Sequence, residues 1–556
     1  MAKVIVLGGG VAGLSAAHEL VERGFEVEVY EKSAVVGGKA RSVTKVGSGT
    51  GGRRDLPGEH GFRFFPGFYQ HVTDTMRRIP FGTNLNGVLD NLVNAPESAA
   101  AQEGKPFFTF LTHQPKTIED WQLILHDWFT QAELGIIPAD GAFFLDRLLD
   151  VMSMCNDRRL VELEASRWWD FIDAANRSPA YQKLLATGLT RSLVAMAAQI
   201  ANTRTISTIL IQMLMTLASQ FGTLDRVLNG PTSDVWIAPW ETRLIGKGVK
   251  IFKNSAIDRF DFDGTVITDA VVNLPTGPAM VRGDYYLLAV PTEVAATLFN
   301  AQMTKKAPSL ANVAKLEVRW MNGIQFYLRR NVSGCRGHIN LADSAWALTC
   351  IAQPQFWPGT NLLQYGNGEV AGLISVDISD WLTPGNKTTN KQAAQCSSAQ
   401  EVADEAWAQL VAHFQNSMDP LTNADRLDWS LDPDINFPVP LGEYLVNKEP
   451  LLINTVGSWA NRPDAVTGID NLFLASDYVR TNTNLATMEG ANEAARRAVN
   501  GILSRAGSTE PPCAVWGLRE PAIFDPLKKI DQILFDHGWP HPGFEAMKGL
   551  LRHGRA

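Results

Sequence analysis

Three glycines near the N-terminus have the spacing of a phosphate-binding turn. Gly8, Gly10 and Gly13 form the pattern G-x-G-x-x-G. In such a turn the first glycine permits a tight bend, the second lets the backbone approach a pyrophosphate, and the third lets a helix pack closely on a strand. Val11 and Ala12 would present backbone N–H groups at the positive end of that helix. The pattern therefore predicts a dinucleotide site.

An acidic residue stands where it can bind a ribose. Glu31 follows the alternating segment Phe25–Tyr30, and Lys32 comes directly after it. A carboxylate at the end of the second strand can accept hydrogen bonds from both ribose hydroxyls, which disfavours a 2′-phosphate. The site is therefore expected to prefer an unphosphorylated adenosine ribose, with Lys32 among its contacts.

The elements that must position these residues are readable nearby. Lys3–Leu7 is a short β-branched apolar run, typical of a strand buried on both faces. Ala12–Arg23 has helical apolar spacing and stops at Gly24, and Phe25–Tyr30 alternates as a strand does. Together they predict one βαβ unit of Rossmann type.

The segment beyond this unit distinguishes FAD from NAD. It reads Val36-Gly37-Gly38-Lys39-Ala40-Arg41-Ser42. Paired glycines followed by cations can lie along a longer dinucleotide and offer it more N–H donors and a guanidinium. We therefore expect Gly38, Lys39 and Arg41 to contact FAD. Gly8–Ser42 as a whole resembles the N-terminus of the flavin-containing amine oxidase superfamily, which includes monoamine oxidases and carotenoid desaturases.

A second segment, Glu59–Tyr69, is an aromatic-rich stretch. It resembles a segment of phytoene and zeta-carotene desaturases that runs near the isoalloxazine ring of the flavin. The resemblance implies that Phe62, Arg63 and Phe64 contact the flavin. Arg63 would stabilise developing negative charge, and Glu59 would hold Arg63 or the flavin ribose, which makes these two the candidate catalytic residues. An internal ion pair that ties down the loop is the alternative.

A third segment runs from Asn461-Arg462-Pro463 to the core Met488-Glu489-Gly490-Ala491. It resembles the C-terminal flavin motif of the family in its desaturase form. This resemblance implies that Asp477 accepts hydrogen bonds from hydroxyls of the flavin cofactor, and that backbone N–H groups from Thr487 onwards face the pyrimidine end of the ring. Ser476 stands where the family usually has glycine. The predicted contacts in and near this motif are Ser476, Asp477, Thr487, Met488 and Ala491, with Ile257 meeting the adenine.

The predicted fold is α/β, with a Rossmann-type FAD domain built from discontinuous segments and an inserted substrate domain of helices and mixed sheet. The expected FAD domain comprises residues 1–79, 235–300 and 450–505, with a strand at Gly248–Phe260 and a closing helix at Asn492–Ser504. The expected substrate domain comprises 80–234, read as mainly helical, and 301–449, with strands at Trp320–Arg329 and Val370–Ile378 and a helix at Ala399–Asn416. Residues 506–556 form a C-terminal extension, in which Ala522–Phe535 is expected to be an amphipathic helix that docks on the body or on lipid.

Composition narrows the possible partners. The 556 residues carry a net charge of −8, so nothing resembles the basic surface that nucleic acid requires. The five cysteines have no metal-ligand spacing, which predicts reduced buried thiols and no metal site. The start of the chain shows no signal peptide pattern, and the apolar stretch around 192–221 is interrupted. A cytoplasmic protein with at most peripheral membrane contact is expected, of unknown oligomeric state.

The expected function is FAD-dependent oxidation of a hydrophobic, isoprenoid-like substrate. Hydride would pass between an allylic carbon and flavin N5, and oxygen or a quinone would accept the electrons. The apolar stretch Leu193–Leu217 favours a long hydrophobic substrate, although plain core packing explains such stretches more often.

Four other functions remain open. Thr481–Leu485 contains no aromatic residue, whereas monoamine-oxidase-like enzymes usually have one there, so an amine substrate is disfavoured but not excluded. Hydroxysqualene dehydroxylase, which resembles the chain in the same segments, acts on a squalene-type alcohol. A redox-neutral isomerase would need identical flavin contacts. Rab GDP-dissociation inhibitors resemble this fold and bind prenyl chains without redox chemistry, but they predict a decayed FAD site.

Overall fold

A five-stranded parallel sheet carries the glycine motif in the computed structural model, which describes residues 2–61, 63–112, 135–194, 196–218, 223–437 and 445–553. Its spatial order is β21 (Leu472–Leu474), β11 (Tyr285–Leu288), β1 (Lys3–Leu7), β2 (Glu26–Tyr30) and β7 (Lys250–Phe252). All four neighbouring pairs are parallel. Since strands from the beginning, middle and end of the chain share this sheet, the predicted discontinuous Rossmann-type fold is confirmed.

Three helices pack together beside this sheet. α1 (Val11–Glu22) contacts both α14 (Met488–Arg505) and α10 (Ala238–Gly246), and all three contribute to one apolar core with the strands. Gly24 follows α1 with φ of +78°, the left-handed conformation that glycine adopts readily after a helix end. The helices expected over Ala12–Arg23 and Asn492–Ser504 are therefore present, the second beginning at Met488.

The segment Gly248–Phe260, expected to be one strand, is divided between two sheets. β7 joins the parallel sheet, whereas β8 (Ala256–Phe262) pairs with β9 (Ile267–Leu274), which pairs with β10 (Gly277–Val281). Asn254 lies between them with φ of +53°, a left-handed conformation that asparagine tolerates better than most residues. The chain turns there and leaves the first sheet.

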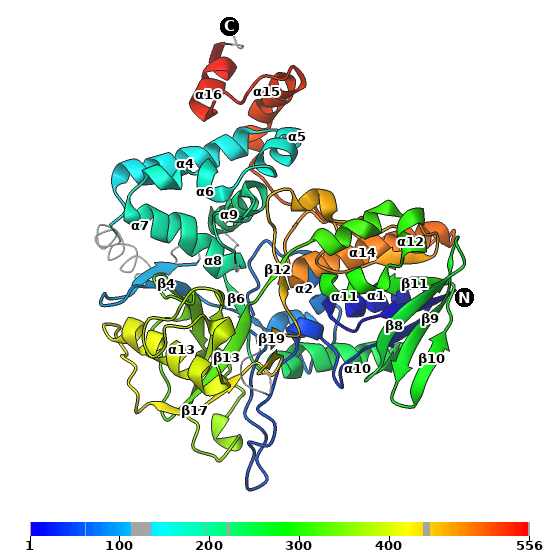
Figure 1. The fold of residues 1–556 in the computed structure, drawn as a ribbon, viewed down its shortest axis with the longest axis horizontal. Helices are drawn as coiled ribbons and strands as arrows, with labels where there is room; N and C mark the ends of the chain where they lie inside the picture. Colours follow the sequence, from blue (N-terminus) through cyan, green and yellow to red (C-terminus); the bar gives the residue numbers. More distant parts are fainter. Residues whose placement is uncertain are drawn as a thin grey trace.

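A seven-stranded mixed sheet forms the second lobe, at the lower left in Figure 1. Its spatial order is β17 (Arg426–Leu431), β13 (Asn322–Leu328), β16 (Gly372–Ile378), β15 (Leu348–Ala352), β14 (Gly337–Leu341), β4 (Glu97–Ala101) and β5 (Phe108–Leu111). Helix α13 (Ala399–Phe414) packs on its apolar residues. The two strands and the helix expected between residues 320 and 416 are confirmed.

The segment 80–234 is not purely helical, which corrects the sequence interpretation. It supplies β4 and β5 to the seven-stranded sheet, and β3 (Leu92–Asn94) pairs with β6 (Arg226–Leu228). Its longer helices are α4 (Pro138–Ser153) and α9 (Thr203–Ala218), above the second lobe in Figure 1. The short strands were hidden because alanine-rich Glu97–Ala101 has weak strand propensity and is ordered by pairing with β14 on one side and β5 on the other. Trp121 and Trp128 lie outside the described residues.

The apolar stretch Leu193–Leu217 is not one helix. α8 (Leu189–Val194) ends inside this stretch, and α9 begins only at Thr203, where the Asn202 side chain accepts a hydrogen bond of 2.8 Å from the Thr205 N–H. Asn202 thus caps the first turn of α9. No helix within the described ranges is long and apolar enough to cross a membrane.

The C-terminal extension docks on the helical part of the body. α15 (Asp525–Asp536) contacts α4 and α5 (Asn156–Arg158), and α16 (Phe544–His553) contacts α4 (Figure 1). Asp531 and Arg158 form a buried ion pair of 2.9 Å at this contact. The expected amphipathic helix therefore exists and faces the protein on one side. All five cysteines are buried free thiols, as predicted.

Candidate functional site

The turn between β1 and α1 needs its glycines for steric reasons. Gly8 has φ of +110°, and a β-carbon there would lie 2.4 Å from the Ala289 carbonyl oxygen. A β-carbon on Gly13 would lie 1.9 Å from the Gly8 carbonyl oxygen, which is far inside van der Waals contact. The first and third glycines therefore have the roles that the motif predicts: a strained turn and close packing of helix on strand.

The N-terminus of α1 is open to a ligand. Gly10 is its N-cap residue and offers no side-chain hydrogen bond, so the N–H groups of the first turn keep their partial positive charge. The α-carbon of Gly38 would lie 3.7 Å from a β-carbon on Gly10, so any side chain there would fill the space between the two loops. This cradle, next to a helix N-terminus, fits the pyrophosphate of a dinucleotide.

Glu31 is held by the backbone around the glycine turn. Its Oε2 accepts a hydrogen bond of 2.7 Å from the Gly9 N–H, and its Oε1 accepts one of 2.8 Å from the Ser33 N–H. Each carboxylate oxygen has two lone pairs, so both retain capacity to accept from ribose hydroxyls. The side chain is 5 % exposed and lines the main cavity.

A cavity of about 680 Å³ brings most of the predicted FAD contacts together. Those that line it are Gly8, Gly10, Val11, Ala12, Glu31, Lys32, Gly38, Lys39, Arg63, Phe64, Ile257, Ser476, Asp477, Thr487, Met488 and Ala491. Three predicted residues are placed elsewhere: Gly13 packs inside the turn, and Arg41 and Glu59 lie behind the wall. Phe62 lies outside the described residues. The three predicted FAD segments thus converge on one space.

Arg41 is engaged by carboxylates of the chain itself. Its Nη1 donates to the Gly38 carbonyl at 2.8 Å and to Glu449 at 3.0 Å, and its Nη2 donates to Asp434 at 2.7 Å. Lys32 pairs with the other oxygen of Glu449 at 3.1 Å. Arg41 therefore holds the Gly38 loop in place and ties it to the segment 434–449, and its predicted direct contact with FAD remains a proposal.

The acidic groups around Arg41 have opposite pKa shifts. Burial raises the pKa of Glu449, but the charges of Arg41 and Lys32 outweigh it and lower the pKa to about 2. Burial and the charges of Glu449 and Asp432 raise the pKa of Asp434.

A cluster of possible metal-ligating side chains lies nearby. One nitrogen of His60 and one carboxylate oxygen each of Asp432 and Asp434 lie within 4.8 Å of one another, an arrangement that the sequence interpretation did not include. His60 Nδ1 lies 2.7 Å from Asp432, which also accepts from Asn322.

The depressed pKa of Glu449 predicts a pH-dependent contribution to stability. Because the folded pKa lies below the unfolded value of about 4.3, the contribution is fully present above that value and is lost as pH falls towards 2. We expect Glu449→Gln to lose about 3 kcal/mol of unfolding free energy at pH 6 and much less near pH 3. Urea unfolding of both proteins across this range measures the difference, and an equal loss at every pH would contradict it.

Glu59 and Arg63 form a buried pair at the wall of the cavity. Arg63 Nη2 lies 4.0 Å from Glu59 Oε2 and donates to the Lys39 carbonyl at 2.8 Å. Glu59 Oε1 accepts from the Thr232 N–H at 2.8 Å and from the Ser42 hydroxyl at 3.0 Å. Burial raises the pKa of Glu59 and lowers that of Arg63, and the charge of each counteracts the shift of the other. Arg63 reaches the cavity, whereas Glu59 supports the loop behind it.

The C-terminal motif is braced by a buried arginine. Arg462 Nη1 donates to the Asp477 carbonyl at 2.7 Å, and its Nη2 donates to Asn454 at 2.9 Å. Burial lowers the pKa of Arg462 to about 10, and the charge of Asp477 counteracts that shift. The Ser476 hydroxyl donates to Asp477 at 3.2 Å. Arg462 therefore positions the segment that carries Asp477 at the cavity.

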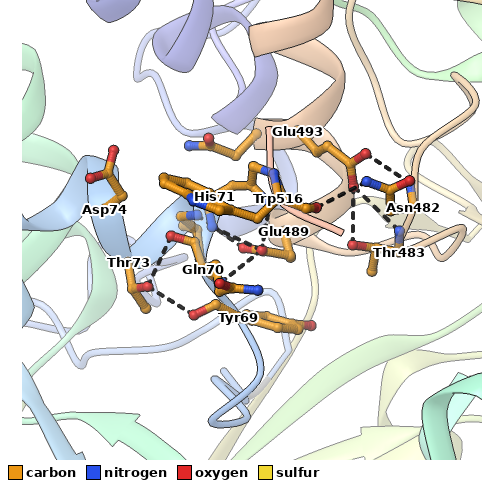
Figure 2. A network of polar contacts seen from close by, with 12 residues as sticks. Tyr69, Gln70, His71, Thr73, Asp74, Asn482, Thr483, Glu489, Glu493 and Trp516 are labelled. Carbon is orange, nitrogen blue, oxygen red and sulfur yellow. Dashed lines mark hydrogen bonds and ion pairs between the residues drawn. The ribbon is translucent and has the colours of Figure 1, made fainter. Parts of the chain in front are cut away.

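Glu489, in the middle of the C-terminal motif, points away from the cavity into a network with α2 (His71–Arg77). Figure 2 shows it beside Gln70 and His71. Its carboxylate accepts from the N–H groups of Gln70, His71 and Val72 at 2.8–2.9 Å and from His71 Nδ1 at 2.7 Å. His71 Nε2 accepts from the Trp516 N–H at 3.0 Å, which assigns the remaining proton to Nδ1. Glu489 thus caps α2 and connects it to α14 and the C-terminal extension.

The first turn of α14 faces the cavity, although Glu489 in the same turn points away from it. Thr487 is its N-cap residue, and its hydroxyl accepts a 3.1 Å hydrogen bond from the Gly490 N–H. Thr487, Met488 and Ala491 line the cavity, so the positive end of this helix faces the cavity. One helix turn therefore supports both the ligand site and, through Glu489, the fold.

Beyond the FAD segments the same cavity has mainly apolar walls. The residues there include Phe108, Phe110, Ile136, Leu184, Leu185, Leu189, Met213, Leu224, Met321, Leu451, Leu452 and Leu485. Sequence reasoning missed nearly all of them, because single apolar residues in short elements carry no motif. Two signals were available: the alternation of Phe108 and Phe110 in β5, and the helical spacing of Leu185 and Leu189.

Comparisons with known proteins agree with this arrangement. Residues 11–503 match the family model described as flavin containing amine oxidoreductase. Zeta-carotene desaturase of Arabidopsis thaliana is 22 % identical over 90 % of this chain and 85 % of its own length, and that of Synechocystis sp. is 23 % identical over 90 % and 97 %. Cyclohexylamine oxidase from Brevibacterium oxydans has a similar fold, with a TM-score of 0.58, 13 % identity and coverage of 91 % and 99 %.

These matches agree with the glycine turn, the open helix N-terminus and the buried carboxylate of Glu31 at the cavity. The cofactor is FAD, and the residues that line the cavity fit it. The protein is a flavin-dependent oxidoreductase. The match extends over nearly the whole chain, so the protein belongs to the flavin-containing amine oxidoreductase family.

Proposed function

We propose that the protein transfers a hydride between an allylic carbon of a hydrophobic, isoprenoid-like substrate and N5 of FAD. One observation carries the proposal: the space lined by the FAD segments continues, as a single cavity of about 680 Å³, into a chamber with mainly apolar walls. An apolar molecule in that chamber would have direct access to the flavin. The similarity to zeta-carotene desaturases along most of the chain supports an isoprenoid substrate.

The residues of the chain bind, orient and exclude water. FAD, when bound, supplies the redox chemistry by accepting the hydride. Thr487 and Met488 bring the positive end of α14 to the cavity, where it favours an anionic ligand. The apolar side chains of Leu185, Leu189 and Met213 keep bulk water away from the reacting carbon.

We assign Arg63 the role of a charge-stabilising group at the cavity. Its guanidinium is buried, lies in the wall and is held by the Lys39 carbonyl and by Glu59. A buried cation stabilises negative charge that develops nearby more strongly than an exposed one. Glu59 acts through Arg63 and is a positioning residue in this proposal. Molecular oxygen or a quinone would reoxidise the cofactor.

Anaerobic reduction of the holoenzyme tests the substrate class. The flavin absorbance at about 450 nm should bleach with phytoene or a squalene derivative and persist with simple amines. Bleaching by amines alone would overturn the proposal in favour of an amine oxidase. A change in the isoprenoid without net bleaching, and without consumption of an electron acceptor, would indicate a redox-neutral isomerase.

A further inference from the structure

One wall of the apolar chamber carries a polar row. In the seven-stranded sheet, Asn340 of β14 lies opposite Thr349 of β15, which lies opposite Asp377 of β16. Paired residues of neighbouring strands share a face, so these three side chains form a row across the sheet, and all three line the cavity. His338 lies two residues before Asn340 and lines the cavity too.

The other face of the same strands is apolar. Ile339, Cys350 and Val376 pair with one another in register and are buried in the core beneath α13. The alternation of the three strands thus separates an ordinary core face from a polar face that is turned towards the chamber. A chamber made only for hydrocarbon would not need polar side chains on this wall, where any polar atom left without a hydrogen bond costs free energy.

Among the residues that the structure describes, two oxygen atoms on this wall find no hydrogen-bond partner, one on Thr349 and one on Asp225. Thr349 is 6 % exposed, and its hydroxyl oxygen is unpaired. Asp225 is 2 % exposed; its Oδ2 lies 2.5 Å from His338 Nδ1, whereas its Oδ1 is unpaired. Buried polar atoms in native proteins are nearly always paired with protein, water or ligand. These two atoms therefore mark a place where a ligand supplies the missing partners.

The polar row lies next to the segment expected beside the flavin. Phe64 packs edge-on against His338, with ring centroids 5.9 Å apart, and both line the cavity. Phe108, Phe110 and Met213 supply the apolar walls of the same chamber. A ligand that fits both surfaces has an apolar body and one small polar group.

We propose that Asp225, His338, Asn340 and Thr349 form a sheet-wall subsite that binds a hydroxyl group carried by an otherwise apolar substrate. A hydroxyl can donate to Asp225 Oδ1, and it can accept from or donate to the Thr349 hydroxyl. The inference rests on the proposed function and narrows its substrate class from isoprenoids in general to isoprenoid alcohols. An isoprenoid hydrocarbon would leave both oxygens buried and unpaired.

The test compares two probes that differ by one oxygen. The holoenzyme is titrated with geranylgeraniol and with the hydrocarbon in which hydrogen replaces its hydroxyl, and binding is followed by the perturbation of the flavin spectrum. The alcohol should bind at least about ten-fold more tightly to the wild type, and Thr349→Val should remove most of that preference. Thr349→Ser, which keeps the hydroxyl, should retain it.

Stability measurements separate a ligand site from a structural role. Valine has nearly the shape of threonine and removes an unpaired buried oxygen, so Thr349→Val should leave the unfolding midpoint of the substrate-free holoenzyme unchanged or raised. A lowered midpoint would show that the hydroxyl supports the fold, which would overturn the proposal. Weaker FAD binding in the valine variant would show that the row holds the cofactor, which would also overturn it.

The remaining outcomes distinguish this inference from the function on which it rests. Equal binding of alcohol and hydrocarbon would refute the subsite and leave the isoprenoid proposal intact. If neither probe binds and amines bleach the flavin, both proposals are refuted.

Discussion

Gly13→Ala should strongly weaken FAD binding. The added methyl carbon would lie 1.9 Å from the Gly8 carbonyl oxygen, so α1 must move away from the turn that forms the cradle. Backbone overlap of this kind cannot be relieved by a rotamer change, and we expect a cost of about 3 kcal/mol, or about a hundred-fold loss of FAD affinity. The ratio of flavin to protein absorbance after purification, and FAD titration of the apoprotein, measure the loss.

Gly141→Ala provides the matched control. Gly141 also lies in the first turns of a helix, α4, but a β-carbon there meets nothing within 4 Å. Alanine has the higher helix propensity, so this variant should keep its flavin and gain up to about 1 kcal/mol of stability. Normal FAD content in Gly13→Ala would mean that the turn does not hold the pyrophosphate.

Glu489→Ala should destabilise the fold and release FAD together. The substitution leaves three N–H groups of the α2 N-terminus and the His71 Nδ1 proton without their acceptor inside a buried network (Figure 2). Removing one partner from such a site costs about 3–5 kcal/mol. Because Thr487 and Met488 start the same helix and line the cavity, FAD should be lost at a lower urea concentration than in the wild type.

Two further variants serve as comparisons for this result. Glu489→Gln keeps one carbonyl oxygen and should have an intermediate effect, since a neutral amide accepts fewer and weaker hydrogen bonds than a carboxylate. Glu545→Ala, at an exposed glutamate of α16, should change stability by less than about 0.5 kcal/mol. Wild-type unfolding of Glu489→Ala would show that Glu489 does not hold α2 and α14 together.

The N-terminal FAD segment was predictable because its signals are local. Gly8 and Gly24 adopt positive φ, and Gly13 packs against the Gly8 carbonyl five residues before it, so all three have a local reason to be glycine. Apolar alternation places β1 and β2 around them. The resemblance in the C-terminal segment located Asp477 and Thr487, which also line the cavity. The prediction of β7 and β8 as one strand was wrong, because a single left-handed residue, Asn254, redirects the chain.

The amino-acid sequence was therefore sufficient for the fold class and the cofactor, since glycine turns and strand periodicity depend on neighbours along the chain. The partners of Arg41 and Glu489 come from segments hundreds of residues away, and no local pattern encodes such pairs. The polar row of Asn340, Thr349 and Asp377 likewise arises only when strands align in register. Long-range packing decides which side chains meet in the chamber, because closing those loops brings together residues that the sequence keeps far apart.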